Sequence, residues 1–502
     1  MVSDLPAFLF LVPPLAGAVI LTATSSLYRR RFYPAARWLV SISSLVLSMA
    51  LLVWMAPPLP ASYRLNGFGP PAGSYLLLDG LSAFLCLTAV SVVSLSVVFS
   101  YRYMEHDLGK NRYYSLMLLL TTGLLGVFVS GDLFTLFVFW ELMCISSYAL
   151  VSFRKHEWEP LEAGFKYLVM STVGSLVALY GISLIYGIAG TLDIGGIGAA
   201  LAVAGPVGYF PLAMIVAGFG VTAAMVPFHT WLPDAHPAAP SPVSAVLSGL
   251  VIKGGVYAIF RILFAGFTTY SFAVPLIVMG AATLTLGNLM VFAQQDIKRF
   301  FAYSSVANMG LILLAGGSAK YISEVNPAGA GLAYMAMAGA LFHVLNHALG
   351  KSLLFLSSGS MIHSAGTRSI ESLEGIGRRM PWSGGALMVG LLSLAGIPPL
   401  GGFWSKLLVL APLAYSLAAG DPALAAAFFV VLINSLLAAG YYIWLAQRIA
   451  FRPGALPEGI RESPPSMVIP LAVLSLMCLA VTFALPWLVP ALEAISRSLM
   501  GA

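Results

Sequence analysis

Apolar runs recur along the whole chain and are separated by short polar connections. A helix needs about 20 apolar residues to cross the hydrocarbon core of a bilayer. Runs of that order fall near residues 5–27, 35–56, 76–101, 113–130, 132–153, 161–188, 207–231, 240–265, 272–294, 299–316, 331–361, 384–412, 423–449 and 467–490. The pattern predicts an all-α membrane protein with about fourteen transmembrane helices. No connection is long enough for a soluble domain, so we expect residues 1–502 to form a single membrane domain.

Two of the predicted helices are broken by proline and glycine. The run at 207–231 leads into the stretch VPFHTWLPDAHPAAPSPVS, and the run at 384–412 contains GIPPLGGFWSKL. Broken backbone at membrane depth must be shielded by protein or line a water-filled cavity. Paired breaks in two halves of a chain are typical of inverted repeats around an ion path. We therefore predict two inverted five-helix repeats with broken helices 7 and 12, at about 113–265 and 272–449, flanked by helices within 5–101 and 467–490.

Composition and the placement of basic residues agree with a membrane protein. Hydrophobic residues make up 59% of the chain and charged residues only 9%, whereas a soluble domain has roughly 25% charged residues. Of the 25 Lys and Arg residues, seventeen lie in connections after odd-numbered helices, among them Arg29, Arg30 and Arg31, and four lie in the even connections and the tail. Because basic loops stay in the cytoplasm, we expect a multi-pass protein of the cell membrane with both termini outside, and no binding of nucleic acid.

Four lysines remain inside predicted helices: Lys166, Lys253, Lys351 and Lys406. A charge at membrane depth is expensive and marks a functional site by default. A desolvated lysine can release and regain a proton near neutral pH, which favours a relay role. Alternatively, a lysine near a helix end extends to the membrane surface. That alternative fits Lys166, near the start of its helix, as well as a relay does, whereas the other three lie deeper.

The segment FHVLNHALGKSLLFL places His343, His347 and Lys351 four residues apart. Residues at this spacing stack on one helix face about 6 Å apart, which predicts a relay for protons. Two histidines at this spacing can also bind a metal, but no acid on that face completes a site, so we expect no metal. We also expect no cofactor in this chain, because its three cysteines have no CxxC spacing and no nucleotide-binding glycine motif follows a strand.

Acidic residues are scarcer within the predicted helices. Glu141 lies mid-helix in FTLFVFWELMCISSYALV, where burial disfavours the charged carboxylate unless a cation or water stabilises it. Asp79 and Asp132 each stand near a helix start, where aspartate commonly caps backbone N–H groups. The Pro-rich connection adds three titratable residues that fit either a proton exit or a solvated turn: His229, Asp234 and His236.

Five ordered motifs carry a resemblance to a known family: FWELMCISSYALV, VPFHTWLPDAHPAAPSPVSA, QDIKRFFAYSSVANMG, FHVLNHALGKSLLF and GIPPLGGFWSK. Together they resemble the antiporter-like subunits shared by respiratory complex I, membrane-bound hydrogenases and related ferredoxin-linked complexes, and Mrp-type Na+/H+ antiporters. The resemblance covers nearly the whole chain. It implies a fourteen-helix fold with two half-channels, and other membrane subunits, including homologous antiporter-like ones, as partners in the lipid bilayer.

The same resemblance implies roles for individual residues. Glu141 matches the acid of helix 5, Lys253 the central lysine of helix 8, and Lys406 the lysine of broken helix 12, while the connecting relay matches His343, His347 and Lys351. One position departs from the family pattern. Counting back nine residues from the Trp of the WLP motif, where the family usually has a lysine, reaches Thr222. A threonine can order water but cannot change charge. Either Lys253 or a water chain takes over as the partner of Glu141, or the first half-channel is altered or silent.

We therefore expect a proton- or sodium-translocating subunit of a complex I-related, redox-driven ion pump, such as a membrane-bound hydrogenase or an NADH- or ferredoxin-linked oxidoreductase, with no redox centre of its own. A subunit of an Mrp-type Na+/H+ antiporter is the first alternative. A structural subunit that conducts nothing is the second, and Thr222 favours it. A lone transporter of an organic solute is disfavoured, because the titratable groups form a line rather than a pocket.

Overall fold

The computed structural model describes residues 5–25, 35–54, 59–65, 67–68, 73–326, 329–418, 420–452, 456 and 459–501. Within this part of the chain, 11 helices are long and apolar enough to cross a membrane, which agrees with the predicted multi-pass membrane protein. The basic run Arg29, Arg30 and Arg31 lies outside the described residues. The chain divides into two compact units: unit 1 holds Met1–Ala223 and Gly254–Tyr270, and unit 2 holds Ala224–Lys253 and Ser271–Met500.

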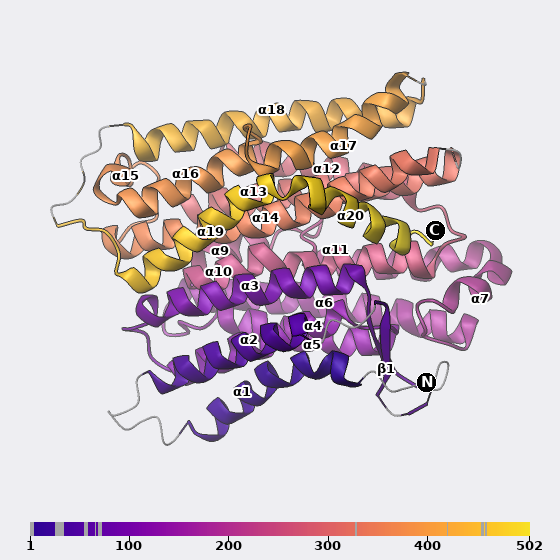
Figure 1. The fold of residues 1–502 in the computed structure, drawn as a ribbon, viewed down its shortest axis with the longest axis horizontal. Helices are drawn as coiled ribbons and strands as arrows, with labels where there is room; N and C mark the ends of the chain where they lie inside the picture. Colours follow the sequence, from indigo (N-terminus) through magenta and orange to yellow (C-terminus); the bar gives the residue numbers. More distant parts are fainter. Residues whose placement is uncertain are drawn as a thin grey trace. The chain divides into compact units, whose positions relative to one another are not determined.

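Unit 1 consists mainly of helices that run side by side, in the indigo to magenta part of Figure 1. Gly174 allows close packing between α6 and α8, because a Cβ at this position would lie 2.7 Å from the Val221 side chain. The elements are η1 (Leu5–Leu11), α1 (Val12–Ala23), α2 (Ala36–Trp54), β1 (Ala61–Arg64), β2 (Tyr75–Leu78), α3 (Gly80–Tyr103), α4 (Lys110–Phe128), α5 (Leu133–Val151), α6 (Trp158–Ala189), α7 (Ile197–Ala204), η3 (Gly205–Gly208), α8 (Tyr209–Thr222), most of α11 (Ile252–Arg261) and η5 (Ile262–Gly266).

A small two-stranded sheet, which was not predicted, accompanies the helices. Strands β1 and β2 pair antiparallel, with Ala61 opposite Leu78. The apolar run that was predicted to form a helix from residue 76 therefore begins as a strand, and the helix α3 starts only at Gly80. Hydrophobicity alone does not separate the two elements, because a short apolar strand that continues into an apolar helix gives one uninterrupted run.

Two aspartates cap helices of unit 1, as predicted. Asp79 Oδ1 accepts a hydrogen bond from the Ser82 N–H at 2.9 Å, and Asp132 Oδ1 accepts one from the Thr135 N–H at 2.8 Å. These bonds satisfy N–H groups that have no partner inside the helix. Asp132 Oδ2 also accepts from the Tyr75 N–H at 3.0 Å, which ties β2 to the start of α5.

Asp79 has a second function that its position in the sequence did not reveal. Its Oδ2 lies 2.6 Å from Nη1 of Arg261, and both side chains are largely buried, with exposed fractions of 14% and 6%. Arg261 also donates to Ser82 Oγ at 3.1 Å and to the Tyr257 hydroxyl at 3.1 Å. The guanidinium is thus enclosed by a carboxylate and two hydroxyls, which joins the end of α11 to the start of α3.

Unit 2 is built around α14, which packs against α10, α13, α16, α17, α19 and α20. Its small and polar residues are buried along most of its length. The elements of unit 2 are α9 (Leu232–Ala238), α10 (Ser241–Val246), the π-helical η4 (Leu247–Val251), α12 (Ala273–Val291), α13 (Ile297–Val325), α14 (Ala330–Ala365), α15 (Ile376–Arg379), α16 (Pro381–Ala395), α17 (Gly401–Ala418), α18 (Pro422–Ala450), α19 (Pro465–Phe483) and α20 (Leu485–Leu499).

Helices are interrupted at both of the predicted places. The helix predicted to reach residue 231 ends at Thr222, and Ala224 then adopts a left-handed conformation with φ of 52°. The predicted boundary was wrong because the apolar sequence continues past the point where the backbone turns. The second break separates α16, which ends at Ala395, from α17, and Gly396 takes the left-handed position after the helix, with φ of 85°.

The predicted bounds of the last helix, 467–490, were also wrong. It spans the end of α19 at Phe483 and the start of α20 at Leu485. Pro486 stands in the first turn of α20, a position where proline fits because its missing N–H would have no partner there. The apolar run conceals this junction, because residues on both sides of it are hydrophobic.

Substituting Gly402 tests the close packing at the second break. A Cβ at this position would lie 1.7 Å from the Ser393 carbonyl oxygen, whereas a Cβ at Gly385 in α16 meets nothing within 4 Å. Alanine is worth about 1 kcal/mol more than glycine in a helix interior. We therefore expect Gly402→Ala to lower the thermal unfolding midpoint of the purified protein and Gly385→Ala to leave it unchanged or raise it. Equal midpoints for the two variants would contradict this packing.

A second prediction concerns the buried ion pair between Asp79 and Arg261. In Asp79→Asn the charge of Arg261 stays buried without its anion, and breaking a buried pair in this way costs about 3–5 kcal/mol. We expect a clearly lower unfolding midpoint. The control is Glu105→Gln, which breaks the exposed pair with Arg102, where exposed fractions are 40% and 48% and the loss is below about 1 kcal/mol. A similar effect of both variants would mean that the buried pair contributes little.

Candidate functional site: a buried row of lysines and histidines

Lys253 and His347 meet inside unit 2. The Lys253 ammonium nitrogen lies 2.5 Å from His347 Nδ1 and donates to the Ser248 carbonyl oxygen, also at 2.5 Å. The π turn of η4 makes this carbonyl available, because the Ile252 N–H bonds to Leu247 O rather than to Ser248 O. Lys253 is 2% exposed and His347 is fully buried. The central lysine is therefore in direct contact with the relay that the sequence predicted on α14.

His343, one helical turn from His347, is held by side chains from two other helices. Its Nε2 lies 2.9 Å from Asn308 Oδ1 on α13, and its Nδ1 lies 2.9 Å from Ser405 Oγ on α17. The ring centroids of His343 and His347 are 6.3 Å apart. Both rings are buried, and His347 Nε2 has no hydrogen-bond partner.

Lys351 continues the same face of α14. Its ammonium donates to the Phe301 carbonyl oxygen at 3.0 Å and to the Ser304 hydroxyl. It also lies 5.6 Å from the centre of the Phe301 ring and 5.8 Å from that of Tyr442. A ring face attracts a cation, so this site accepts the charged amine without a carboxylate.

Lys406 is held by the end of a broken helix. Its ammonium donates to the carbonyl oxygens of Leu394 at 3.0 Å and Ala395 at 3.1 Å. The last four carbonyls of a helix have no partner within it; the N–H groups of Gly396 and Ile397 take the preceding two, at Ser393 and Leu392. Lys406 thus satisfies the two carbonyls that remain at the end of α16, where the helix dipole also favours a cation.

The three buried lysines share one electrostatic feature. None of them forms an ion pair with a carboxylate among the described residues; each is solvated by backbone carbonyls, hydroxyls, a ring nitrogen or aromatic faces. An amine bound by neutral acceptors is not locked in its charged form, as it would be beside an acid. This arrangement is suited to taking up and releasing protons.

Unit 1 contains a separate acidic site. Glu141 on α5 has a buried Oε1 with no hydrogen-bond partner. Cys144, one turn along α5 from Glu141, interacts with Ser171 and Thr222. Thr222, 1% exposed, is the last residue of α8. No ion pair of Glu141 with a basic residue occurs within the described part of the chain.

The secondary candidates lie in other environments. Lys166 pairs with Glu162 at 2.8 Å and is 49% exposed, which fits the surface alternative. Asp234 forms an ion pair with Arg299 at 3.3 Å. The Nδ1 of His229 is buried without a partner. Asp79 is engaged by Arg261, as described above.

Sequence reasoning missed the neutral members of the row, Asn308 and Ser405. Neither residue can titrate, and each lies far from His343 along the chain, so spacing provided no signal. Only the proximity of Ser405 to Lys406 and the presence of Asn308 within a quoted motif pointed to this neighbourhood. Within the described residues, no group of three or more His, Cys, Asp or Glu side chains forms a metal-binding cluster.

Two known protein families match parts of this chain. The family described as NADH:quinone oxidoreductase/Mrp antiporter, TM, matches residues 130–434, and the N-terminal family of NADH-ubiquinone oxidoreductase (complex I) chain 5 matches residues 73–114. NADH-quinone oxidoreductase subunit N of Desulforudis audaxviator is 32% identical, over 98% of this chain and 100% of that protein.

Solved structures share the fold over nearly the whole chain. A chain of the membrane-bound sulfane sulfur reductase, an archaeal respiratory membrane complex, matches with a TM-score of 0.86 and 28% identity, over 99% of this chain and 98% of that one. A chain of the Mrp complex from Dietzia sp. DQ12-45-1b has the same fold, with a TM-score of 0.86 at 24% identity, over 100% of this chain and 98% of that one. The protein therefore belongs to the NADH:quinone oxidoreductase/Mrp antiporter family of membrane subunits.

Proposed function

We propose that this chain is the proton- or sodium-translocating, antiporter-like subunit of a complex I-related, redox-driven ion pump. The observation that carries the proposal is the contact between Lys253 and His347, at 2.5 Å in the middle of a row of buried titratable side chains. We infer that the chain works beside other membrane subunits, including homologous antiporter-like ones, and that those partners carry the redox groups.

The row supports a stepwise movement of protons. Lys253 and His347 are close enough to pass a proton directly. The two histidine rings, with centroids 6.3 Å apart, are too far apart for a direct hydrogen bond, but one water molecule spans such a gap. We infer that the path continues from His343 toward Lys406 on α17. The neighbouring Ser405 Oγ lies 2.9 Å from His343 Nδ1 and donates to the Gly402 carbonyl oxygen at 3.0 Å, which positions the ring.

Lys351 is linked to His343 through groups that do not titrate. Its ammonium bonds to Ser304, whose carbonyl oxygen accepts from Asn308 Nδ2 at 2.6 Å. Asn308 in turn contacts His343. The amide and carbonyl of this link do not titrate, so we assign to Asn308 the positioning of the His343 ring rather than the transfer of a proton.

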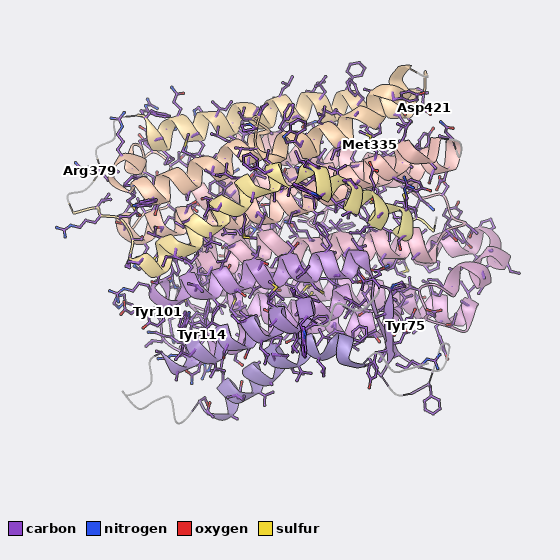
Figure 2. The ribbon with its side chains drawn as sticks, in the orientation of Figure 1. Tyr75, Tyr101, Tyr114, Met335, Arg379 and Asp421 are labelled. Carbon is purple, nitrogen blue, oxygen red and sulfur yellow. The ribbon has the colours of Figure 1, made fainter. Side chains whose placement is uncertain are left out.

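We also propose the number of membrane-spanning helices, their repeat and the orientation of the chain. We infer fourteen transmembrane helices in two inverted five-helix repeats, at about 113–265 and 272–449, with both chain termini outside the cell membrane. The two helix breaks, after Thr222 and after Ala395, support paired half-channels. In unit 2, Figure 2 has Arg379 and Asp421 at opposite ends, and the basic end is the one expected in the cytoplasm.

The acidic site of unit 1 extends the proposal to the first half of the chain. Glu141 Oε1 is buried without a hydrogen-bond partner, and burial of an unpaired polar group is unfavourable, so we infer that this carboxyl group takes part in ion translocation. Ser171 and Thr222 interact with Cys144, one turn along α5 from Glu141. We infer that this half-channel operates in an altered form, with hydroxyls where the family pattern leads one to expect a lysine.

An Mrp-type antiporter subunit is the alternative function. It is supported by the description of the matching family, which names both complexes. The two functions differ in their energy source, because the redox-linked subunit translocates ions only when electrons flow. A non-conducting structural subunit is the third possibility, and the substitutions below distinguish it from both.

Removing the central amine is the principal test. We expect Lys253→Ala to abolish ion translocation in the assembled complex, because His347 then has no amine with which to exchange a proton. The measurement is electron-driven uptake of protons or sodium by membrane vesicles, with assembly checked by native gel electrophoresis. Lys166→Ala, which removes a half-exposed amine from unit 1, should retain most of the activity. Unchanged uptake by Lys253→Ala would favour the structural subunit.

The first half-channel has its own test. We expect Glu141→Gln to lower the translocation rate, because glutamine keeps the shape of the side chain but cannot bind and release a proton. Glu162→Gln, in a carboxylate that is 46% exposed, serves as the matched control. A rate for Glu141→Gln equal to that of the control would mean that this half-channel is silent.

A further inference from the structure

A cavity of about 1040 Å³ lies at one end of unit 1, where α5 ends and α4 and α6 begin. Tyr101 and Tyr114, on the helices beside it, stand at the end of unit 1 away from Tyr75 in Figure 2. The lining contains five lysines and arginines and two histidines, against two acidic residues. The proton-relay residues of unit 2 do not line it, so this cavity needs a separate explanation.

The acidic groups of the cavity are already matched. Asp107 accepts from Arg154 through both carboxylate oxygens, at 2.7 Å and 3.0 Å, and Glu157 also interacts with Arg154. Arg112 and Lys155, in contrast, are exposed at the cavity and form no ion pair among the described residues. The cavity therefore retains positive charge that faces outward and suits an anion.

An apolar surface continues from the same cavity. Leu108 and Leu161 line it and are 80% and 46% exposed. Trp158, at the start of α6, is 75% exposed, and Phe165, one turn beyond Leu161 on the same face, is 65% exposed. Exposed tryptophan at a helix start is typical of the membrane–water interface. The cavity thus lies where a charged surface meets a surface suited to acyl chains.

We propose that this cavity binds the phosphate of an anionic phospholipid, with the acyl chains along Leu161 and Phe165. Basic pockets between transmembrane helices on the cytoplasmic side bind phospholipid head groups by this chemistry. A free phosphate ion would use the basic residues but not the adjoining apolar face. The proposal does not depend on ion translocation, and its test does not measure it.

The test compares two double variants of the full chain in its complex. Arg112→Gln with Lys155→Gln removes two charges from the cavity, and Arg64→Gln with Arg379→Gln removes two exposed charges elsewhere. Dioctanoyl phosphatidylglycerol is titrated by calorimetry in detergent, with dioctanoyl phosphatidylcholine and inorganic phosphate as comparison ligands. Native mass spectrometry counts the anionic lipids that each complex retains.

We expect the cavity variant to bind phosphatidylglycerol roughly 30-fold more weakly and to retain one lipid fewer, while the control variant matches the native protein. Phosphatidylcholine should bind weakly to all three. Equal affinities of the two double variants would overturn the proposal. So would inorganic phosphate that binds as tightly as the lipid, which would indicate a site for a free anion, or a partner subunit that covers the cavity and excludes lipid in the intact complex.

Discussion

The structure depends on how an amine is stabilised in a region from which water and anions are largely excluded. A carboxylate partner would stabilise a lysine but would also fix it in its charged form. Here Lys253, Lys351 and Lys406 bond instead to backbone carbonyl oxygens. Carbonyl dipoles attract an ammonium group and impose little penalty when the amine is neutral, so both protonation states remain accessible.

For Lys253 and Lys406 the carbonyl oxygens come from irregular helices, whereas Lys351 shares the Phe301 carbonyl oxygen within the regular helix α13. The π turn in η4 leaves the Ser248 oxygen to Lys253, and the end of α16 leaves two carbonyls to Lys406. Gly396 is part of the second arrangement, because a Cβ there would lie 3.2 Å from the Lys406 side chain. Irregular backbone is therefore the source of the carbonyl ligands of two of the three buried lysines, Lys253 and Lys406.

Much of this architecture was predictable from local signals. Proline and glycine located both breaks, aspartates located the starts of α3 and α5, and the four-residue spacing placed His343, His347 and Lys351 on one face. The rest depends on contacts between distant segments. Asn308 and Ser405 have neutral side chains and reach His343 only in the folded chain. Arg261 pairs with Asp79 although the two residues are 182 positions apart in the sequence. The short strands and the α19–α20 junction could not be predicted, because the sequence stays hydrophobic at the points where the backbone conformation changes.

The absence of carboxylates among the described contacts of the row has a consequence for its operation. Positive charges that share a medium of low dielectric repel one another strongly, and no neighbouring acid offsets that repulsion here. A positive charge on Lys253 therefore disfavours a second positive charge on the His347 ring, whose Nδ1 lies 2.5 Å from the amine. Neighbouring groups of the row are therefore disfavoured from being charged at the same time, which supports the proposed stepwise movement of a proton from one position to the next.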